Sequence, residues 1–169
     1  MILSAKTIKY GDDINTDLII PGKFTKTLDL QELASHCMED LDPEFHEKCK
    51  ESGAFIVAGD YFGCGSSREQ APVALKESGV KCVVAKSFSR IFYRSAINIG
   101  LPLVECDTTD INDGDELEYE IGGKVLKDLT TGREYEIFPL PGLMVEILSN
   151  GGMVEFVKNG GFSRLAGGE

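Results

Sequence analysis

A turn rich in glycine and hydroxyl side chains precedes an apolar run near the middle of the chain. It reads YFGCGSSREQAPVAL, from Tyr61 to Leu75, and places Ser66, Ser67 and Arg68 directly before the run. If a helix begins here, its free N–H groups and the positive end of its dipole favour an anion. Arg68 adds a planar fork that suits a carboxylate, and Gly65 lets the backbone approach a ligand closely. The pattern predicts a site for a small anionic substrate, in which the same donors would stabilise Ser66 as a transient alkoxide.

The same turn also fits a purely structural interpretation. Ser66 to Glu69 matches the capping box S-x-x-E, and Ser67 to Gln70 matches its S-x-x-Q form. The turn does not contain the hydrolase motif G-x-S-x-G. It also does not match the dinucleotide-binding motif G-x-G-x-x-G, because Arg68 stands where the third glycine of that motif belongs. Besides an enzyme, a stand-alone module that binds an anion without chemistry stays open.

Composition argues against several classes of partner. The chain has 169 residues, of which 42% are hydrophobic and 27% charged, and its net charge is −11. Such a charge argues against non-specific binding to nucleic acid or to an anionic membrane, because both need basic surface. The sequence has no 18-residue apolar segment, and its start, MILSAKTIKYGDD, lacks the apolar region of a signal peptide. We expect one domain over residues 1–169, in the cytoplasm, with neither nucleic acid nor membrane as a partner.

The five cysteines do not follow a metal-binding pattern. They are odd in number and irregularly spaced, without a C-x-x-C pair: Cys37, Cys49, Cys64, Cys82 and Cys106. We expect reduced, mostly buried thiols and no metal ligand in this chain. If iron takes part in the reaction, another chain must hold it.

Alternating apolar runs predict an α/β fold. Strands are expected in AKTIKYG, AFIVAGDYFG, KCVVAKS and LPLVEC, and helices in LQELASHCMEDL, QAPVALKESG and SRIFYRSAINIG, whereas DDINTDLIIPGKFTKTLD is expected to be a loop. Short connections between the strands and helices indicate parallel β-α-β units. From about Asp107, short runs separated by Gly-Gly and Thr-Gly turns predict antiparallel hairpins, followed by a helix from Leu143 to Leu148. We therefore expect a single α/β domain with a parallel β-α-β core and an additional antiparallel β layer.

Three separated motifs resemble the aconitase superfamily, and within it the small-subunit family of the isopropylmalate dehydratases. They are YGDDINTDLIIPGKF (Tyr10 to Phe24), the turn after Tyr61, and KSFSRIFYRSAINIGLPLVE (Lys86 to Glu105). The motifs stand in the family's order, and the resemblance covers essentially the whole chain. It implies the fold of the aconitase swivel domain, which closes over a [4Fe–4S] cluster held by a separate large subunit.

The resemblance also implies a reaction. A hydro-lyase of this kind removes water from a 2-hydroxy diacid and adds it back at the neighbouring carbon, which converts 2-isopropylmalate to 3-isopropylmalate through isopropylmaleate in leucine biosynthesis. Carried over by motif, Ser66 takes the proton from the carbon beside a carboxylate, while Ser67 and Arg68 bind a substrate carboxylate. A neutral serine is too weak a base at its ordinary pKa, so the helix terminus and Arg68 must assist it. The chain would be active only beside its cluster-bearing large subunit.

The loop after the first motif departs from the family pattern and leaves the substrate open. In the family this loop commonly continues with Tyr-Leu and two variable residues that sort substrates, whereas this chain has Phe24, Thr25, Lys26 and Thr27. Lys26 either pairs with a distal carboxylate, as in a homoaconitase, or points to solvent. Thr25 removes apolar surface and suits a smaller group, as in a 2,3-dimethylmalate or methylmalate dehydratase. We expect Thr25, Lys26 and Thr27 to bind the substrate, with isopropylmalate as the leading choice.

Some polar residues in the first and third motifs have two interpretations. Thr16 and Asp17 either orient the site or serve ordinary turn and cap chemistry. Arg90 and Arg94 lie four residues apart, on one face of an expected helix, where they reach either the large subunit or an internal carboxylate. We favour a structural or interface role for the two arginines.

Overall fold

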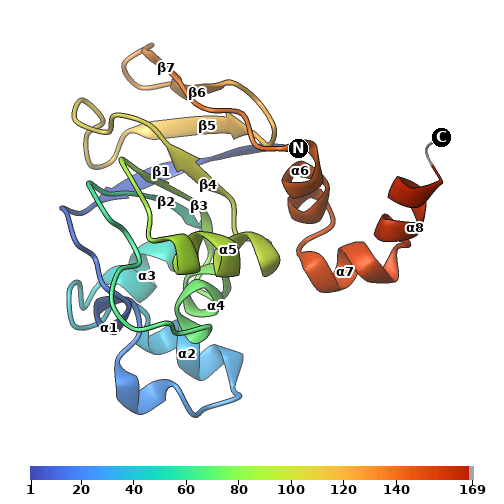
Figure 1. Ribbon diagram of the computed structural model, residues 1–169. Helices are drawn as coiled ribbons and strands as arrows, with labels where there is room; N and C mark the ends of the chain where they lie inside the picture. Colours follow the sequence, from blue (N-terminus) through green and yellow to red (C-terminus); the bar gives the residue numbers. More distant parts are fainter. Residues whose placement is uncertain (168–169) are drawn as a thin grey trace.

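The core of the molecule is a seven-stranded mixed sheet with the strand order β4-β3-β2-β1-β5-β6-β7 (Figure 1). The computed structural model describes residues 1–167. One half of the sheet is parallel and consists of β1 (Ile2–Lys9), β2 (Ala54–Val57), β3 (Val80–Ala85) and β4 (Leu103–Glu105). All four residues of β2 are buried, as expected of a parallel strand covered by helices on both faces. The expected α/β class with a parallel core is confirmed.

The other half of the sheet is antiparallel and joins the first through β1. Strand β1 pairs with β5 (Glu116–Glu120), which pairs with β6 (Val125–Asp128), and β6 pairs with β7 (Glu134–Glu136). The expected antiparallel strands therefore extend the same sheet. Because side chains alternate between the faces of a strand, the β2 residues Phe55 and Val57 pack into one core and Ile56 packs into the other.

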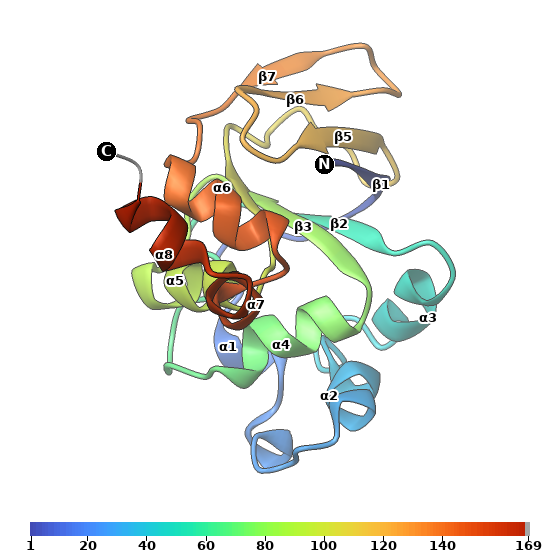
Figure 2. The same ribbon diagram turned by 90° about the vertical axis from the view of Figure 1, so that its right-hand side faces the viewer.

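Helices cover both faces of the parallel half. The core that contains Ile56 lies under α2 (Leu30–His36), α3 (Phe45–Lys50) and α4 (Gln70–Glu77). The core that contains Phe55 lies under α6 (Gly142–Ser149) and α7 (Met153–Lys158), which pack beside α5 (Arg90–Asn98) (Figure 2). The expected helix from Leu143 to Leu148 lies within α6. A short last helix, α8 (Gly161–Ala166), follows α7 and extends away from the sheet (Figure 1).

The segment after β1 is more ordered than the sequence suggests. The sequence predicts a loop here, but the segment contains the single helical turn α1 (Thr16–Ile19) and the 3-10 turn η1 (Gly22–Phe24). The Asn15 side chain accepts a hydrogen bond from Leu18 N and thereby caps α1. Among residues 1–167, no helix has both the length and the apolar character that crossing a membrane requires.

Candidate functional site

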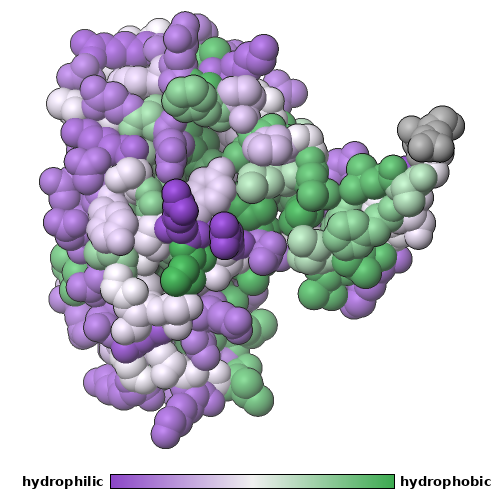
Figure 3. Space-filling model, in the orientation of Figure 1, coloured by the Kyte–Doolittle hydropathy of each residue, from purple (hydrophilic) through white to green (hydrophobic). Residues whose placement is uncertain are grey.

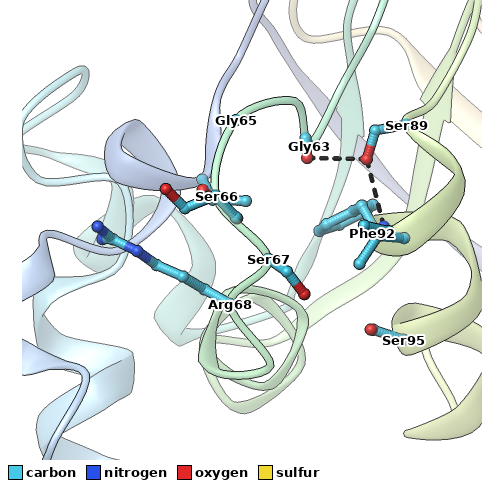
Figure 4. A pocket seen from close by; sticks show the side chains of 10 residues that line it. Gly63, Gly65, Ser66, Ser67, Arg68, Ser89, Phe92 and Ser95 are labelled. Atoms are coloured by element: carbon cyan, nitrogen blue, oxygen red, sulfur yellow. Dashed lines mark hydrogen bonds between the residues drawn. The ribbon is translucent and has the colours of Figure 1, made fainter.

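A pocket opens between the turn after β2 and the first turns of α5 (Figure 4). Small and polar side chains dominate its lining, which consists of Thr16, Gly63, Gly65, Ser66, Ser67, Arg68, Ser89, Ile91, Phe92 and Ser95. The structure thus brings together four of the residues that the sequence proposes for the site: Gly65, Ser66, Ser67 and Arg68. Residues from α1 and α5, far away in the sequence, complete the wall.

Two glycines give the turn its shape. Gly63 has φ +80°, and a Cβ at this position would lie 2.2 Å from Cγ of Phe92 in α5. Its N–H donates to the carbonyl oxygen of Ile14 at 2.8 Å. Gly65 has φ +91°, but a Cβ there would lie 3.5 Å from its nearest neighbour, the Cβ of Asn15, which is an ordinary contact. Only glycine fits the close approach at position 63, while position 65 needs glycine for its backbone angle alone.

Thr16 connects the turn to the segment after β1. Its N–H donates to the carbonyl oxygen of Cys64 at 2.9 Å, and its Oγ1 donates to that of Ser66 at 2.8 Å. The residue is buried, so these two bonds are protected from water. The sequence leaves Thr16 between a turn role and a site role, and the structure shows that it holds the serine turn in place.

The capping-box interpretation of the turn is wrong. Helix α4 begins at Gln70, its N-cap is Glu69, and the cap residue makes no side-chain hydrogen bond. Glu69 has helical angles, φ −63° and ψ −28°, whereas a capping box needs an extended N-cap residue. The Oγ atoms of Ser66 and Ser67 make no hydrogen bond with residues 1–167, and neither do the backbone N–H groups of residues 66–69. Both serines are exposed, so these groups are free for a ligand.

Arg68 is held in place on the α1 side of the pocket. Its Nη1 donates to the carbonyl oxygen of Ile20 at 3.1 Å, and its Nη2 forms an ion pair with Asp17. The Arg68 side chain is 21% exposed and the Asp17 side chain 62%, so the pair lies at the edge of solvent. In Figure 4, Ser66 and Arg68 extend to the same side of the turn, whereas Ser67 points towards Ser95 on α5. A ligand carboxylate near Ser66 would thus find the Arg68 guanidinium beside it.

The loop residues proposed to bind the substrate do not line this pocket. The Thr25 Oγ1 donates to the carbonyl oxygen of Gly22 at 2.8 Å, the Thr27 Oγ1 donates to Glu32 at 2.6 Å, and Lys26 is exposed. The loop is nevertheless tied to the start of α4, because the side-chain amide of Gln70 donates to the carbonyl oxygen of Thr25 at 2.7 Å. Substrate contacts from residues 25–27 stay a prediction.

No cluster of side chains in the described part of the chain is arranged as a metal site. Residues 1–167 contain no group of three or more His, Cys, Asp or Glu side chains arranged to hold a metal ion. Cys64, beside the pocket, is partly buried, and burial together with the negative charge of Asp13 raises the pKa of its thiol. Cys37, Cys49 and Cys82 are buried as free thiols in the core. A raised pKa opposes the thiolate that an iron ligand or a nucleophile requires.

Comparison with known proteins identifies the family. Residues 42–108 match the family model of the aconitase C-terminal domain. The chain is 53% identical over 160 residues to the 3-isopropylmalate dehydratase small subunit of Caldicellulosiruptor bescii, and the aligned residues cover 94% of this chain and 96% of that one. It is 55% identical over 152 residues to the 3-isopropylmalate dehydratase small subunit 1 of Archaeoglobus fulgidus, and the aligned residues cover 89% of this chain and 94% of that one.

A solved structure agrees with these relatives. The crystal structure of 3-isopropylmalate dehydratase from Methanocaldococcus jannaschii is similar to this chain with a TM-score of 0.90 and 45% sequence identity, over 99% of this chain and 100% of that one. The resemblance read from the three sequence motifs is therefore confirmed. This chain belongs to the family of 3-isopropylmalate dehydratase small subunits, in the aconitase superfamily.

Proposed function

We propose that this chain provides the proton-transfer and carboxylate-binding half of a two-subunit 3-isopropylmalate dehydratase. The observation that carries the proposal is the turn from Ser66 to Arg68, whose serine hydroxyls and N–H groups make no hydrogen bond within residues 1–167 and border a pocket. Groups that the fold itself does not use are available to a ligand. The names of the relatives, which are small subunits, imply a large subunit as the partner.

Ser66 is the proposed general base. Its Oγ, held as an alkoxide, accepts the proton from the carbon beside a substrate carboxylate and becomes a neutral hydroxyl. The hydroxyl on the neighbouring carbon leaves as water by taking up a second proton from a general acid, a role that we assign to the partner subunit. The free N–H groups of residues 66–69, the positive end of α4 and the Arg68 guanidinium all favour negative charge on that oxygen. Ser67 and Arg68 bind a carboxylate and thereby hold the substrate carbon near Ser66.

The cofactor of the proposed enzyme belongs to the partner. Since residues 1–167 offer no ligand set for iron, we assign the [4Fe–4S] cluster to the large subunit, where it would polarise the substrate hydroxyl and carboxylate. The part of this chain is to bind a substrate carboxylate, to accept the proton and to cover the substrate against water. Ser66 and Ser67 are exposed, so the pocket is a half-site that needs a partner surface to close it.

Among 2-hydroxy diacids, isopropylmalate is the proposed substrate, in agreement with the names of the relatives. A homoaconitase would need a cation for the additional carboxylate, and the exposed Lys26, outside the pocket lining, is the loop cation to test. A 2,3-dimethylmalate or methylmalate dehydratase would use the reduced apolar surface of Thr25. Anaerobic assays of the assembled enzyme with isopropylmaleate, homoaconitate and dimethylmaleate in parallel separate the three.

The direct test of the proposed mechanism is Ser66→Ala in the complex with the large subunit. Loss of a positioned general base lowers rates by roughly 10²–10⁴-fold, so we expect a kcat reduction of that size while the complex and substrate binding persist. Ser52→Ala, an exposed serine remote from the pocket lining, is the matched control and should retain wild-type turnover. Unchanged turnover in Ser66→Ala would exclude Ser66 as the base.

The main alternative is an anion-binding module without chemistry. It would use the same Arg68 and helix terminus, but it would leave Ser66 without a role. Tight binding of a diacid by the isolated chain, together with the absence of alkene hydration when the large subunit is added, would favour that alternative.

A further inference from the structure

The first turns of α5 present two neighbouring faces. Residues four apart lie on one face of a helix, so Ile91 and Ser95 share the face that lines the candidate pocket. Arg90 and Arg94 share the next face, about 100° around the helix axis. They border a shallow hollow on the surface, together with Phe88, Tyr93, Glu105 and Met144. One helix therefore carries both a wall of the site and a basic surface directly beside it.

The charges of these two arginines are not used within the described part of the chain. Both side chains are exposed, and neither forms an ion pair or a side-chain hydrogen bond with residues 1–167, although Glu105 borders the same hollow. The two arginines do not stabilise α5 through its dipole either, because positive charge near the start of a helix is unfavourable. The first turn of α5 also contains no acidic residue that could pair with them. In a chain with a net charge of −11, two exposed arginines without an ion pair among the described residues are available to a partner.

Exposed apolar side chains lie beside the arginines. Ile91 is 56% exposed and Tyr61 is 53% exposed. Tyr61 belongs to the same rim, because its N–H donates to the Oγ of Ser87, just before α5, at 2.8 Å. In Figure 3, strongly hydrophilic surface over α5 directly adjoins hydrophobic side chains. Arginine, tyrosine and exposed aliphatic side chains in one patch are the composition of a protein–protein interface.

We propose that Tyr61, Arg90, Ile91 and Arg94 form a docking surface for the cluster-bearing large subunit, and that the two arginines pair with Asp or Glu side chains of that subunit. The inference rests on the proposed function, since it is the half-site that requires a partner. A subunit that covers Ser66 and Ser67 meets the Ile91 face of α5, and the arginine face continues the same surface. Charge complementarity then brings the two subunits together in the orientation that closes the pocket.

The test is the affinity between the purified small subunit and the large subunit of the same organism, measured under anaerobic conditions. For Arg90→Glu/Arg94→Glu we expect a dissociation constant at least about tenfold above that of the wild type. Arg90→Lys/Arg94→Lys keeps the charge and should recover most of the affinity. The wild-type dissociation constant should rise between low and moderate salt, and the Glu variant should show a much smaller salt dependence.

Two controls separate docking from folding and from chemistry. Lys124→Glu/Lys127→Glu makes the same change in charge at exposed positions around β6 and should leave the affinity within about twofold of the wild type. Thermal unfolding of each isolated variant shows whether the fold is intact. Ser66→Ala should assemble with wild-type affinity although its turnover is strongly reduced.

The outcomes distinguish the two proposals. Weakened assembly of the Arg90/Arg94 variant, with the β6 control unchanged, supports the docking surface. Wild-type affinity of that variant in an enzyme that hydrates isopropylmaleate would overturn the docking surface and leave the proposed function standing. Failure of the wild-type chains to assemble or to turn over would overturn both.

Discussion

At the scale of single residues, Arg68 has a side chain that contacts on the protein hold in place. Its guanidinium uses one nitrogen for the Ile20 carbonyl and another for Asp17, so two contacts fix the direction of the fork. The Asp17 carboxylate is mostly exposed, and exposed ion pairs contribute only about 0–1 kcal/mol to the free energy of unfolding. Asp17 therefore orients Arg68 more than it stabilises the fold, and a substrate carboxylate can add to the remaining donors.

Substitutions of Arg68 and Asp17 should therefore differ in their effect on substrate binding. Arg68→Lys keeps the charge but loses the fork, so we expect KM for the diacid to rise about tenfold or more in the assembled enzyme, corresponding to at least about 1.4 kcal/mol. Asp17→Asn removes only an exposed partner and should raise KM by a few-fold. Steady-state kinetics with both variants measures the two effects. An equal or larger effect of Asp17→Asn would mean that Asp17 does more than orient Arg68.

At the scale of elements, the turn after β2 is defined by contacts that are distant in sequence. Thr16 holds the Cys64 and Ser66 carbonyls, and Arg68 reaches back to Ile20. The sequence shows a helix start and two candidate capping boxes, and local chemistry alone favours those boxes. The boxes do not form, because these longer-range bonds hold the turn so that Glu69 already has helical angles. For this reason the sequence could point to the turn from Gly65 to Arg68, but not to the freedom of its serine hydroxyls or to the pocket wall from α5.

The two glycines of the turn should respond differently to the same substitution. Gly63→Ala places a methyl group against Cβ and Cγ of Phe92, 2.2 Å from Cγ, and adds the strain of φ +80°, so we expect a loss of several kcal/mol in the free energy of unfolding. Gly65→Ala meets no atom closer than 3.5 Å and should lose only about 1–2 kcal/mol from its backbone angle. Urea unfolding of both variants tests this order. Similar losses in the two variants would show that the Phe92 contact is not limiting.

At the scale of the whole molecule, β1 joins two halves that the sequence describes separately. The strands were recognisable from their apolar patterns, and the β-α-β order was recognisable from short connections. The pairing of β1 with β5, in which Ile2 lies opposite Glu120, was not recognisable from the sequence, because it joins residues more than a hundred positions apart. Short helices such as α1 and α3 were also missed, since one or two turns leave little periodicity to detect.

Thiols that are buried or partly buried at the two cores give the stability of the chain a pH dependence. Burial, as the largest cause, raises the pKa of Cys37, Cys49 and Cys106 to about 12 each. In the unfolded chain a cysteine ionises near pH 8.5. Below that pH the thiols are neutral in both states and their contribution to stability is complete. As the pH rises from about 8.5 towards 12, only the unfolded state loses these protons, so the free energy of unfolding falls.

The fully buried Cys37 isolates one such contribution. At pH 10 its thiol alone should lower the free energy of unfolding of the wild type by about 2 kcal/mol relative to pH 7, because the pH lies about 1.5 units above the unfolded pKa. Cys37→Ala lacks this group, so its stability should fall less steeply over the same interval by about that amount, whatever its stability at pH 7. Urea unfolding of both proteins at pH 7, 8.5 and 10, with reductant present, gives the two slopes. Parallel slopes would show that the Cys37 thiol already ionises in the folded protein, which would place water or a cation beside α2 where the structure has a packed core.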